Sequence, residues 1–146
     1  MKLTTKGRYG LRVMLELAMN RESRPMAVDV ISKNQDISPN YIHVLVTALR
    51  NAGMVRTVRG PNGGYALGQD PKNITILKII EVLEGKQSWV ECLDDACACP
   101  RAPSCAAREL WREVIDSVEG LLSSRTLADL AEQQRAKQEA HLMYYI

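Results

Sequence analysis

The chain has 146 residues, of which 46% are hydrophobic and 25% charged, and it carries a net charge of +2. These values are typical of a globular protein, and no apolar run approaches the roughly 20 residues that a membrane-spanning helix needs. Because the N-terminus lacks the apolar core of a signal peptide, we expect a cytoplasmic protein without a membrane partner. The chain has only two histidines and no nucleotide-binding glycine motif, which argues against an enzyme.

Charge is divided unevenly between the two halves of the chain. Residues 1–65 contain ten Lys or Arg and four Asp or Glu, whereas residues 66–146 contain nine and thirteen. This pattern fits a head that binds a polyanion, joined to an acidic body. It fits equally well two surfaces that are merely solvated differently, so charge alone does not decide the function.

Apolar spacing and capping signals predict three helices in the first 53 residues. The first spans 5–20, and its expected buried face consists of Leu11, Met14, Leu15 and Ala18. The second spans 28–35 and is expected to bury Val30 and Ile31. The third follows the start signal Ser38-Pro39, ends near Gly53 and is expected to bury Ile42, Leu45, Val46 and Leu49.

A β-hairpin is predicted directly after the third helix. Residues 54–58 are typical of a strand, 59–64 of a glycine-rich turn and 65–67 of a returning strand. Three helices followed by a hairpin predict a winged helix-turn-helix DNA-binding domain over residues 1–70. A further helix is expected between Thr75 as its cap and Gly85 as its stop, within a connecting segment that spans 71–90. Its expected buried face consists of Ile76, Ile79, Ile80 and Leu83.

The second half is predicted to hold a cysteine-containing loop over 91–105 and two helices over 106–140. Pro100 and Pro103 argue against regular structure from Trp89 to Cys105. The long helix that follows has an apolar stripe, which suits pairing with a second copy and consists of Ala107, Leu110, Val114, Val118 and Leu121. The alternative is that this helix packs on its own domain instead of pairing with a second copy.

Thr126 and Asp129 predict a capping box for the last helix, and we expect residues 141–146 to be loose. The expected fold class is therefore mainly α with a small β-hairpin wing, a winged helix-turn-helix domain plus a long dimerisation helix.

The exposed face of the third helix is the predicted DNA-reading surface. If its four apolar residues are buried, the outward positions are Asn40, Tyr41, His43, Val44, Thr47 and Ala48. This set offers an amide, an imidazole, a hydroxyl and small apolar groups but no acid, which suits the floor of a major groove. An ordinary solvated face would carry more Glu and Lys, so we interpret this helix as a recognition helix.

The hairpin turn and several basic side chains are predicted to contact the DNA backbone. Arg59 stands beside Gly60 at the wing tip, where an arginine can enter a narrow minor groove and a glycine lets the backbone approach a phosphate. Further candidates for phosphate contacts are Lys2, Lys6, Arg8, Arg50 and Arg56. Any one of them could equally be a solvated charge.

All four cysteines of the chain lie in one short segment, at Cys92, Cys97, Cys99 and Cys105. Such a group in a chain without a secretion signal indicates a metal or iron–sulfur centre rather than a disulfide scaffold. We expect an iron–sulfur cluster, [2Fe–2S] or [4Fe–4S], because thiolate is its standard ligand. Three alternatives stay open: a zinc site, although the usual paired C-x₂₋₄-C knuckles are absent, a thiol switch, or inert thiols.

Several motifs in the chain are similar to those of one family of regulators. They are Met1 to Tyr9, Ile37-Ser38-x-x-Tyr41, the wing Val58-Arg59-Gly60-Pro61-x-Gly63-Gly64-Tyr65, Ile74-x-Ile76-x-x-Ile79-Ile80, the cysteine loop and Leu110-Trp111. On these motifs, which extend over about residues 1–130, the chain resembles the IscR-like (Rrf-type) winged helix-turn-helix transcriptional regulators.

The resemblance implies a homodimer that is held by the long helix and binds a pseudo-palindromic site in promoter DNA, with repression as its output. It implies a base-reading side chain at His43 and a minor-groove arginine at Arg59. It also implies that, where members carry a cluster, the three usual ligands match Cys92, Cys99 and Cys105. Members sense iron–sulfur status, nitric oxide or oxidants, or lack the cluster and answer to metabolic partners.

The fourth ligand departs from the pattern of the family. Some members add a histidine three residues after the last cysteine, where this chain has Arg108, and nitric oxide sensors use an aspartate near the N-terminus, where it has Arg8. We expect Cys97 to serve as the fourth ligand in place of the histidine or aspartate. The fallback ligands are Asp94, Asp95 and Glu109.

The resulting hypothesis is a homodimeric transcription regulator whose promoter binding changes with the occupancy of an iron–sulfur cluster. Its rival is a cluster-free winged-helix regulator that responds to a metabolite or partner protein, with the cysteines as a thiol switch or zinc site. A rival of another class is an electron carrier or cluster-delivery protein, which would need neither the wing nor an acid-free third helix and would not bind DNA in a salt-dependent way.

Overall fold

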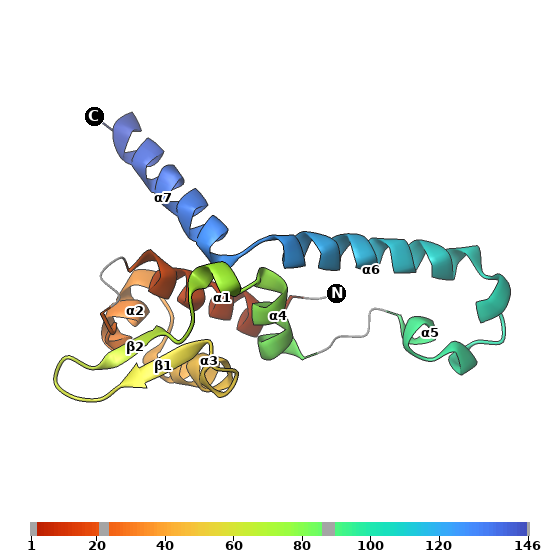
Figure 1. The fold of residues 1–146 in the computed structure, drawn as a ribbon, viewed down its shortest axis with the longest axis horizontal. Helices are drawn as coiled ribbons and strands as arrows, with labels where there is room; N and C mark the ends of the chain where they lie inside the picture. Colours follow the sequence, from red (N-terminus) through yellow and green to blue (C-terminus); the bar gives the residue numbers. More distant parts are fainter. Residues whose placement is uncertain (1–2, 21–23, 86–89, 146) are drawn as a thin grey trace.

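The computed structural model describes residues 3–20, 24–85 and 90–145. Two parts are distinct in Figure 1: a head of packed helices with a hairpin (3–85 and the first turns of the last helix) and an arm (90–124) that extends from it. The elements are, in chain order, α1 Thr5–Met19, α2 Val28–Gln35, α3 Pro39–Asn51, β1 Val55–Val58, β2 Gly64–Leu67, η1 Pro71–Asn73, α4 Ile76–Glu84, α5 Glu91–Asp94, η2 Ala96–Ala98, η3 Ala102–Ser104, α6 Ala106–Ser124 and α7 Leu127–Tyr144. This architecture confirms the predicted fold class.

Helix α1 buries two of its four predicted residues, Met14 and Ala18, on a face that is rotated from the predicted one. Its buried residues are Gly7, Gly10, Val13, Met14, Leu17 and Ala18, whereas Leu11 and Leu15 are only half-buried. A Cβ atom at Gly10 would overlap Leu83 of α4, and one at Gly7 would overlap Glu84. Because the two glycines let α4 pack directly on the backbone of α1, the buried face is turned toward them.

Helix α2 contributes less to the core than predicted. It buries Ile31 and packs Val28, three positions earlier on the same face, against the core, while Val30 lies off that face and is 47% exposed. Helix α3 begins at the predicted signal, where the Ser38 hydroxyl accepts from the Tyr41 backbone N–H at 3.3 Å. The four predicted apolar residues of α3 are buried, and Gly53, at φ 72°, follows its end.

The hairpin is anchored to the head through its second strand. Strands β1 and β2 pair antiparallel in a register from Val55 opposite Leu67 to Val58 opposite Gly64. On the other edge of β2, the Tyr65 and Met26 backbones exchange two hydrogen bonds of 2.8 and 2.9 Å. Gly64 has a φ of 151°, and a Cβ there would overlap the Met26 carbonyl, so this close approach requires glycine.

One apolar core joins α1, α2 and α3 to parts of the chain beyond residue 70. Helix α4 contributes Ile76, Ile79, Ile80 and Leu83 as predicted, and α7 contributes Leu127 and Ala131. Thr75 caps α4 by accepting from the Lys78 backbone at 3.3 Å, and Gly85 follows its end with a φ of 77°. Within the connecting segment, η1 and α4 are thus packed as part of the head.

The chain returns from the arm beside the start of α4. The Ile76 backbone N–H donates to the Arg125 carbonyl at 2.9 Å, and that of Leu127 donates to the Ile74 carbonyl at 2.8 Å. The predicted capping box is present, with the Asp129 N–H donating to the Thr126 hydroxyl and the Thr126 N–H donating to the Asp129 carboxylate. Hydrogen bonds from the backbone and side chain of Thr126 lower the pKa of Asp129.

Helix α7 continues to Tyr144, so the prediction of a loose tail from residue 141 is wrong. The sequence from 127 to 144 contains no glycine or proline, and nothing interrupts the helix. Its far end points away from the head (Figure 1), and Leu142, Met143 and Tyr144 are exposed. None of the helices in the described ranges has the length and apolarity to cross a membrane.

Candidate DNA interface and cysteine loop

The outward face of α3 carries the side chains that were predicted to read DNA. Asn40, His43, Val44 and Thr47 are exposed, Val44 at 55%. Tyr41 and Ala48 are half-buried rather than outward as predicted, because the Tyr41 ring packs edge-on against Tyr9 with centroids 6.1 Å apart. The face remains free of carboxylates, as a surface that approaches DNA bases should be.

The wing extends from the head as a narrow loop (Figure 1). Arg59 and Gly60 lie exposed at its tip, and Gly60 has a φ of 115°, which favours glycine. A Cβ at Gly63 would overlap the Val58 carbonyl, so this tight turn requires glycine at that position. The arginine is thus displayed on a compact turn, a form that fits a minor groove.

A side-chain hydrogen bond joins the wing to α3. Nδ1 of His43 lies 2.6 Å from the hydroxyl of Tyr65 on β2, and the two rings meet edge-on with centroids 5.9 Å apart. The Thr47 hydroxyl donates to the His43 carbonyl at 2.7 Å. His43 is therefore held by neighbours on both elements that were predicted to contact DNA.

The candidate phosphate-binding residues are spread over α1, α3 and β1. Lys6 is half-buried in the first turn of α1, and Arg8, Arg50 and Arg56 are exposed. Arg8 makes a long hydrogen bond, 3.5 Å, to Thr5. Lys2 lies outside the described residues.

The four cysteines lie on the short turns that precede α6. Cys92 is in α5, Cys97 is in η2, Cys99 follows η2 and Cys105 caps α6. Cys97 is exposed and the other three are half-buried. The prediction of no regular structure from Trp89 to Cys105 is thus wrong in part, since α5 and η2 form before Pro100 and η3 includes Pro103. Trp89 itself lies outside the described residues.

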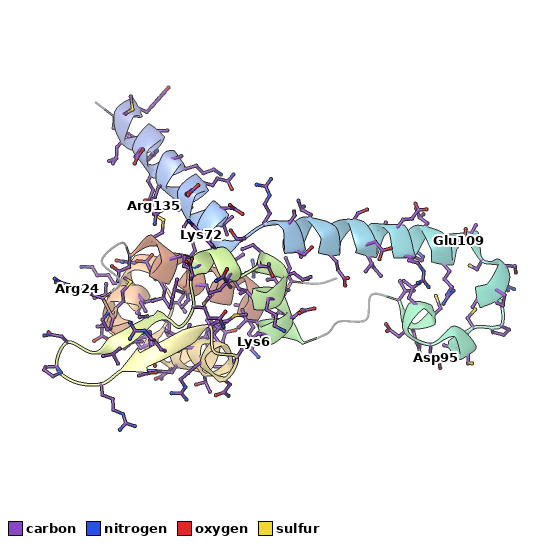
Figure 2. All side chains as sticks on the ribbon, in the orientation of Figure 1. Lys6, Arg24, Lys72, Asp95, Glu109 and Arg135 are labelled. Atoms are coloured by element: carbon purple, nitrogen blue, oxygen red, sulfur yellow. The ribbon has the colours of Figure 1, made fainter. Side chains whose placement is uncertain are left out.

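Two polar contacts shape the cysteine loop (residues 90–105). The Asp95 carboxylate accepts from the Cys97 backbone N–H at 2.8 Å, and Nε of Arg108 on α6 donates to the Cys92 carbonyl at 2.8 Å. Figure 2 shows Asp95 on the short turns and Glu109 on α6, on different sides of the loop. Arg108, at the position where part of the resembling family has a histidine, thus ties α5 to α6.

Comparison with known proteins identifies the family. A family model for the Rrf2 iron-dependent transcriptional regulators matches residues 3–133. The chain belongs to the Rrf2 family. Its similarity to the IscR-like regulators is thereby confirmed, and so is the expectation that it is not an enzyme, because this family consists of transcriptional regulators.

Three relatives of this Rrf2-family chain are similar over most of their lengths. The HTH-type transcriptional regulator CymR of Bacillus subtilis is 45% identical over 144 residues, 99% of each protein, and its structure, that of a global cysteine regulator, aligns with a TM-score of 0.79 over 91% of this chain and 98% of that one. The structure of IscR from T. potens aligns with a TM-score of 0.77 at 33% identity, covering 94% and 91%. The structure of an oxidized form of Staphylococcus aureus CymR aligns with a TM-score of 0.73 at 36% identity, over 90% of this chain and 97% of that one.

Rrf2-family regulators bind DNA and are dimeric. In this member, no residue of α6 is buried, and Leu110, Trp111 and Leu121 are 53%, 46% and 58% exposed. The alternative to pairing, packing on its own head, holds for one end of the helix, because α6 contacts α4 and Leu122 packs against the core of the head. The three exposed side chains above are the part of the apolar stripe that the head leaves uncovered.

The cysteine loop fits an iron–sulfur cluster in donor chemistry but not in arrangement. Thiolates are the ligands such clusters prefer, and four are available here. Among the described residues, however, no three His, Cys, Asp or Glu side chains are grouped so that they could hold a metal ion. The loop therefore has suitable ligands without a preformed cage.

Sequence reasoning missed two residues of this Rrf2-family site. Tyr65 was assigned only to the returning strand, although its hydroxyl reaches His43 across 22 positions of sequence. Arg108 was noted only as a missing ligand, although it connects the two sides of the cysteine loop. Neither contact is local, and no spacing pattern could have revealed it.

Proposed function

We propose that the chain is a homodimeric transcription regulator, with repression as its output, which binds a pseudo-palindromic promoter site through α3 and the wing. The observation that carries this proposal is the exposed, carboxylate-free face of α3, formed by Asn40, His43, Val44 and Thr47. Amide, imidazole and hydroxyl groups can bond base edges, and Val44 can contact a thymine methyl group. Family membership supports DNA binding in general but does not identify the site.

Phosphate contacts supply affinity in this proposal. Arg59 and Gly60 on the wing, Lys6 and Arg8 at the start of α1, and Arg50 at the end of α3 are the assigned contacts, and the half-buried Tyr41 supports the start of α3. Such contacts fix the orientation of a protein on the duplex without reading the sequence. They should make binding strongly salt-dependent.

The exposed stripe of α6 is the proposed contact between two copies. Pairing of the same patch on both copies creates a two-fold axis, and a two-fold axis presents two recognition helices to two half-sites. A pseudo-palindromic operator is therefore the DNA that fits a dimer of this shape.

In vitro selection from random duplex DNA tests the DNA-binding part of this proposal. We expect an enriched sequence with two related half-sites, bound by the dimer with an affinity that falls steeply as salt rises. The variant Asn40→Ala, His43→Ala, Thr47→Ala should keep non-specific binding and lose the preference for the selected site. If the unmodified protein enriches no sequence, the proposed function is wrong.

We further propose that the cysteine loop is the sensor and that its occupant is an iron–sulfur cluster held by Cys92, Cys99 and Cys105, with Cys97 as fourth ligand. The support is the concentration of all four thiols in one loop at the start of α6, the helix assigned to dimerisation. A bound cluster would supply a centre that oxidants, nitric oxide or iron shortage can alter. Asp94, Asp95 and Glu109 remain the fallback for the fourth ligand.

A second candidate for the loop is a thiol switch without a cluster. Three observations favour it: Cys97 is exposed, the described ligands are not grouped, and a relative has been crystallised in an oxidized form. Oxidation of an exposed thiol to a sulfenic acid or a disulfide would then be the signal.

Purification without oxygen separates the two candidates. For a cluster, we expect coloured protein with stoichiometric iron and sulfide, loss of colour in Cys92→Ala, Cys99→Ala and Cys105→Ala, and a lost or labile cluster in Cys97→Ala. Ser104→Ala, in the same loop, is the matched control and should stay coloured. Colourless protein that contains no iron and gains a disulfide on mild oxidation would support the thiol switch instead.

A further inference from the structure

Among the described residues, the contact between His43 and Tyr65 is the side-chain hydrogen bond that links α3 to the wing. It joins Nδ1 of the imidazole to the phenol oxygen at 2.6 Å, a short distance for a hydrogen bond between neutral groups. The ring planes are inclined at 74°, an edge-to-face arrangement that adds to the bond. His43 itself is exposed, so this bond is formed at the surface assigned to DNA.

The phenol is held in place by backbone contacts on both sides of its strand. Tyr65 lies opposite Thr57 in the hairpin, and its N–H and carbonyl both bond the Met26 backbone on the other edge. The preceding Gly64 is required by the close approach to Met26. The Tyr65 side chain is half-buried, so its hydroxyl is presented from a fixed position.

The hydrogen bond to Tyr65 bears on which ring nitrogen of His43 carries the proton. Two neutral tautomers fit this contact, and we assign the one in which the hydroxyl donates to Nδ1 and the ring proton resides on Nε2, because a phenol is a good donor and a neutral ring nitrogen a good acceptor. In a protonated imidazole both nitrogens carry protons, and Nε2 is again a donor. Within the described part of the chain, Nε2 has no hydrogen-bond partner and is free to donate to a ligand.

We propose that Tyr65 is a specificity-determining residue that positions His43, so that Nε2–H is presented as a donor to the acceptor atoms of a guanine in the major groove. Guanine offers N7 and O6 as acceptors on this edge, whereas cytosine offers an amino donor. This inference rests on the proposed DNA-binding function and adds to it the chemistry of one read position. Tyr65 acts through His43 and needs no contact with the DNA itself.

The competing explanation is that Tyr65 only packs the wing against the head. Loss of its hydroxyl would then weaken binding to every sequence alike, or change nothing. A positioning role predicts instead a loss confined to the base that His43 reads, and no additional loss when His43 is absent. These two patterns can be separated by measuring affinity for the four bases at one position.

The experiment uses the full chain and the operator selected in vitro, with all four base pairs placed in turn at each position of a half-site. The position at which His43→Ala abolishes base preference defines the base that His43 reads. There we expect unmodified protein to prefer guanine, and Tyr65→Phe to reduce this preference about two- to tenfold, the effect of one hydrogen bond. Tyr9→Phe, a tyrosine of the same head without a bond to His43, is the matched control and should leave the preference unchanged.

The double variant His43→Ala, Tyr65→Phe completes the cycle. If Tyr65 acts through His43, the double variant should match His43→Ala at every base, with unchanged thermal unfolding. An undiminished guanine preference in Tyr65→Phe would overturn the inference, and so would an equal loss at all four bases. Failure of the unmodified protein to select any operator would instead overturn the proposed function, so the two failures are distinguishable.

Discussion

The head and the arm differ in how far each part buries its own apolar side chains. In the head, Ile42, Leu45 and Ile79 are fully buried, and the core draws on α1, α2, α3, α4 and α7. In the arm, no residue of α6 is buried, although its apolar stripe is as long as that of any helix in the head. The head therefore covers most of its own apolar side chains, whereas Leu110, Trp111 and Leu121 of the arm remain exposed.

The same contrast holds for polar groups. Thr4 and Gly7 at the start of α1 donate three hydrogen bonds to one oxygen of Glu84 at the end of α4. Even exposed polar atoms of the head are therefore hydrogen-bonded to elements that are distant in sequence. In the arm, four free thiols are gathered in the cysteine loop without a grouped metal site among the described residues. This difference in polar contacts fits a head that serves as the stable scaffold and a cysteine loop that serves as the responsive element.

The largest effect is expected from truncation of the core of the head. Ile79→Ala should lower the free energy of unfolding by about 2–5 kcal/mol, because it leaves a cavity in a closely packed region. Leu121→Ala in the arm is the matched comparison. Denaturant unfolding at several protein concentrations should show a concentration-independent loss for Ile79→Ala and a loss for Leu121→Ala only where dimers form; similar losses in both would break the contrast.

A charge in the apolar stripe should separate the two copies. The double variant Leu110→Glu, Leu121→Glu is expected to raise the dissociation constant of the dimer about 30-fold or more, as for a central interface residue. Sedimentation velocity measures the change, and the head should keep its unfolding behaviour. Ser123→Glu, on the opposite side of α6 by helical periodicity, is the control and should remain dimeric.

Loss of the arginine on the wing should weaken DNA binding moderately and leave the properties of the arm unchanged. Arg59→Ala is expected to weaken DNA binding about three- to tenfold and to reduce the slope of affinity against salt by about one. Titration of labelled operator at several salt concentrations measures both. Dimerisation and iron content should be unchanged, and a wing variant that altered them would show that head and arm are not separable.

The smallest effect is expected at the junction where the arm returns to the head. Because its pKa is lowered, the Asp129 carboxylate stabilises the folded chain at pH values above the ordinary carboxyl pKa, and this contribution disappears as the pH falls through the lowered value. Asp129→Asn should therefore lower the melting temperature slightly near neutral pH and differ less from the unmodified protein in acid. Asp116→Asn on α6 is the control, and an equal pH dependence in both variants would argue against the capping role.

Local signals in the sequence were sufficient for the parts of the fold that depend on neighbouring residues. Ser38 with Pro39, Gly53, and Thr126 with Asp129 each act within one helical turn, and each was predicted correctly. The apolar spacing of α3 and α4 also gave their buried faces. Such signals depend on helix geometry alone.

Other features depend on which distant element packs where, and the sequence could not supply them. The buried face of α1 follows from Gly7 and Gly10, which leave no apolar side chain for a periodicity to detect. Val30 satisfied the apolar pattern but found no neighbour to cover it. In the candidate site, the residues of α3 and the cysteines could be proposed from their types, whereas the bonds of Tyr65 and Arg108 arise only from the folded chain.

The arm leaves after Gly85 and comes back at Arg125, whose carbonyl bonds Ile76 at the other end of the same short helix. Entry and exit are thus separated by the length of α4, and the arm is a side branch attached to the scaffold at the two ends of this helix. Since the entropy of closing such a branch grows only with the logarithm of its length, longer or shorter versions would disturb the scaffold little. A single DNA-reading unit built this way can accept sensors of different size and chemistry without redesign of its own fold.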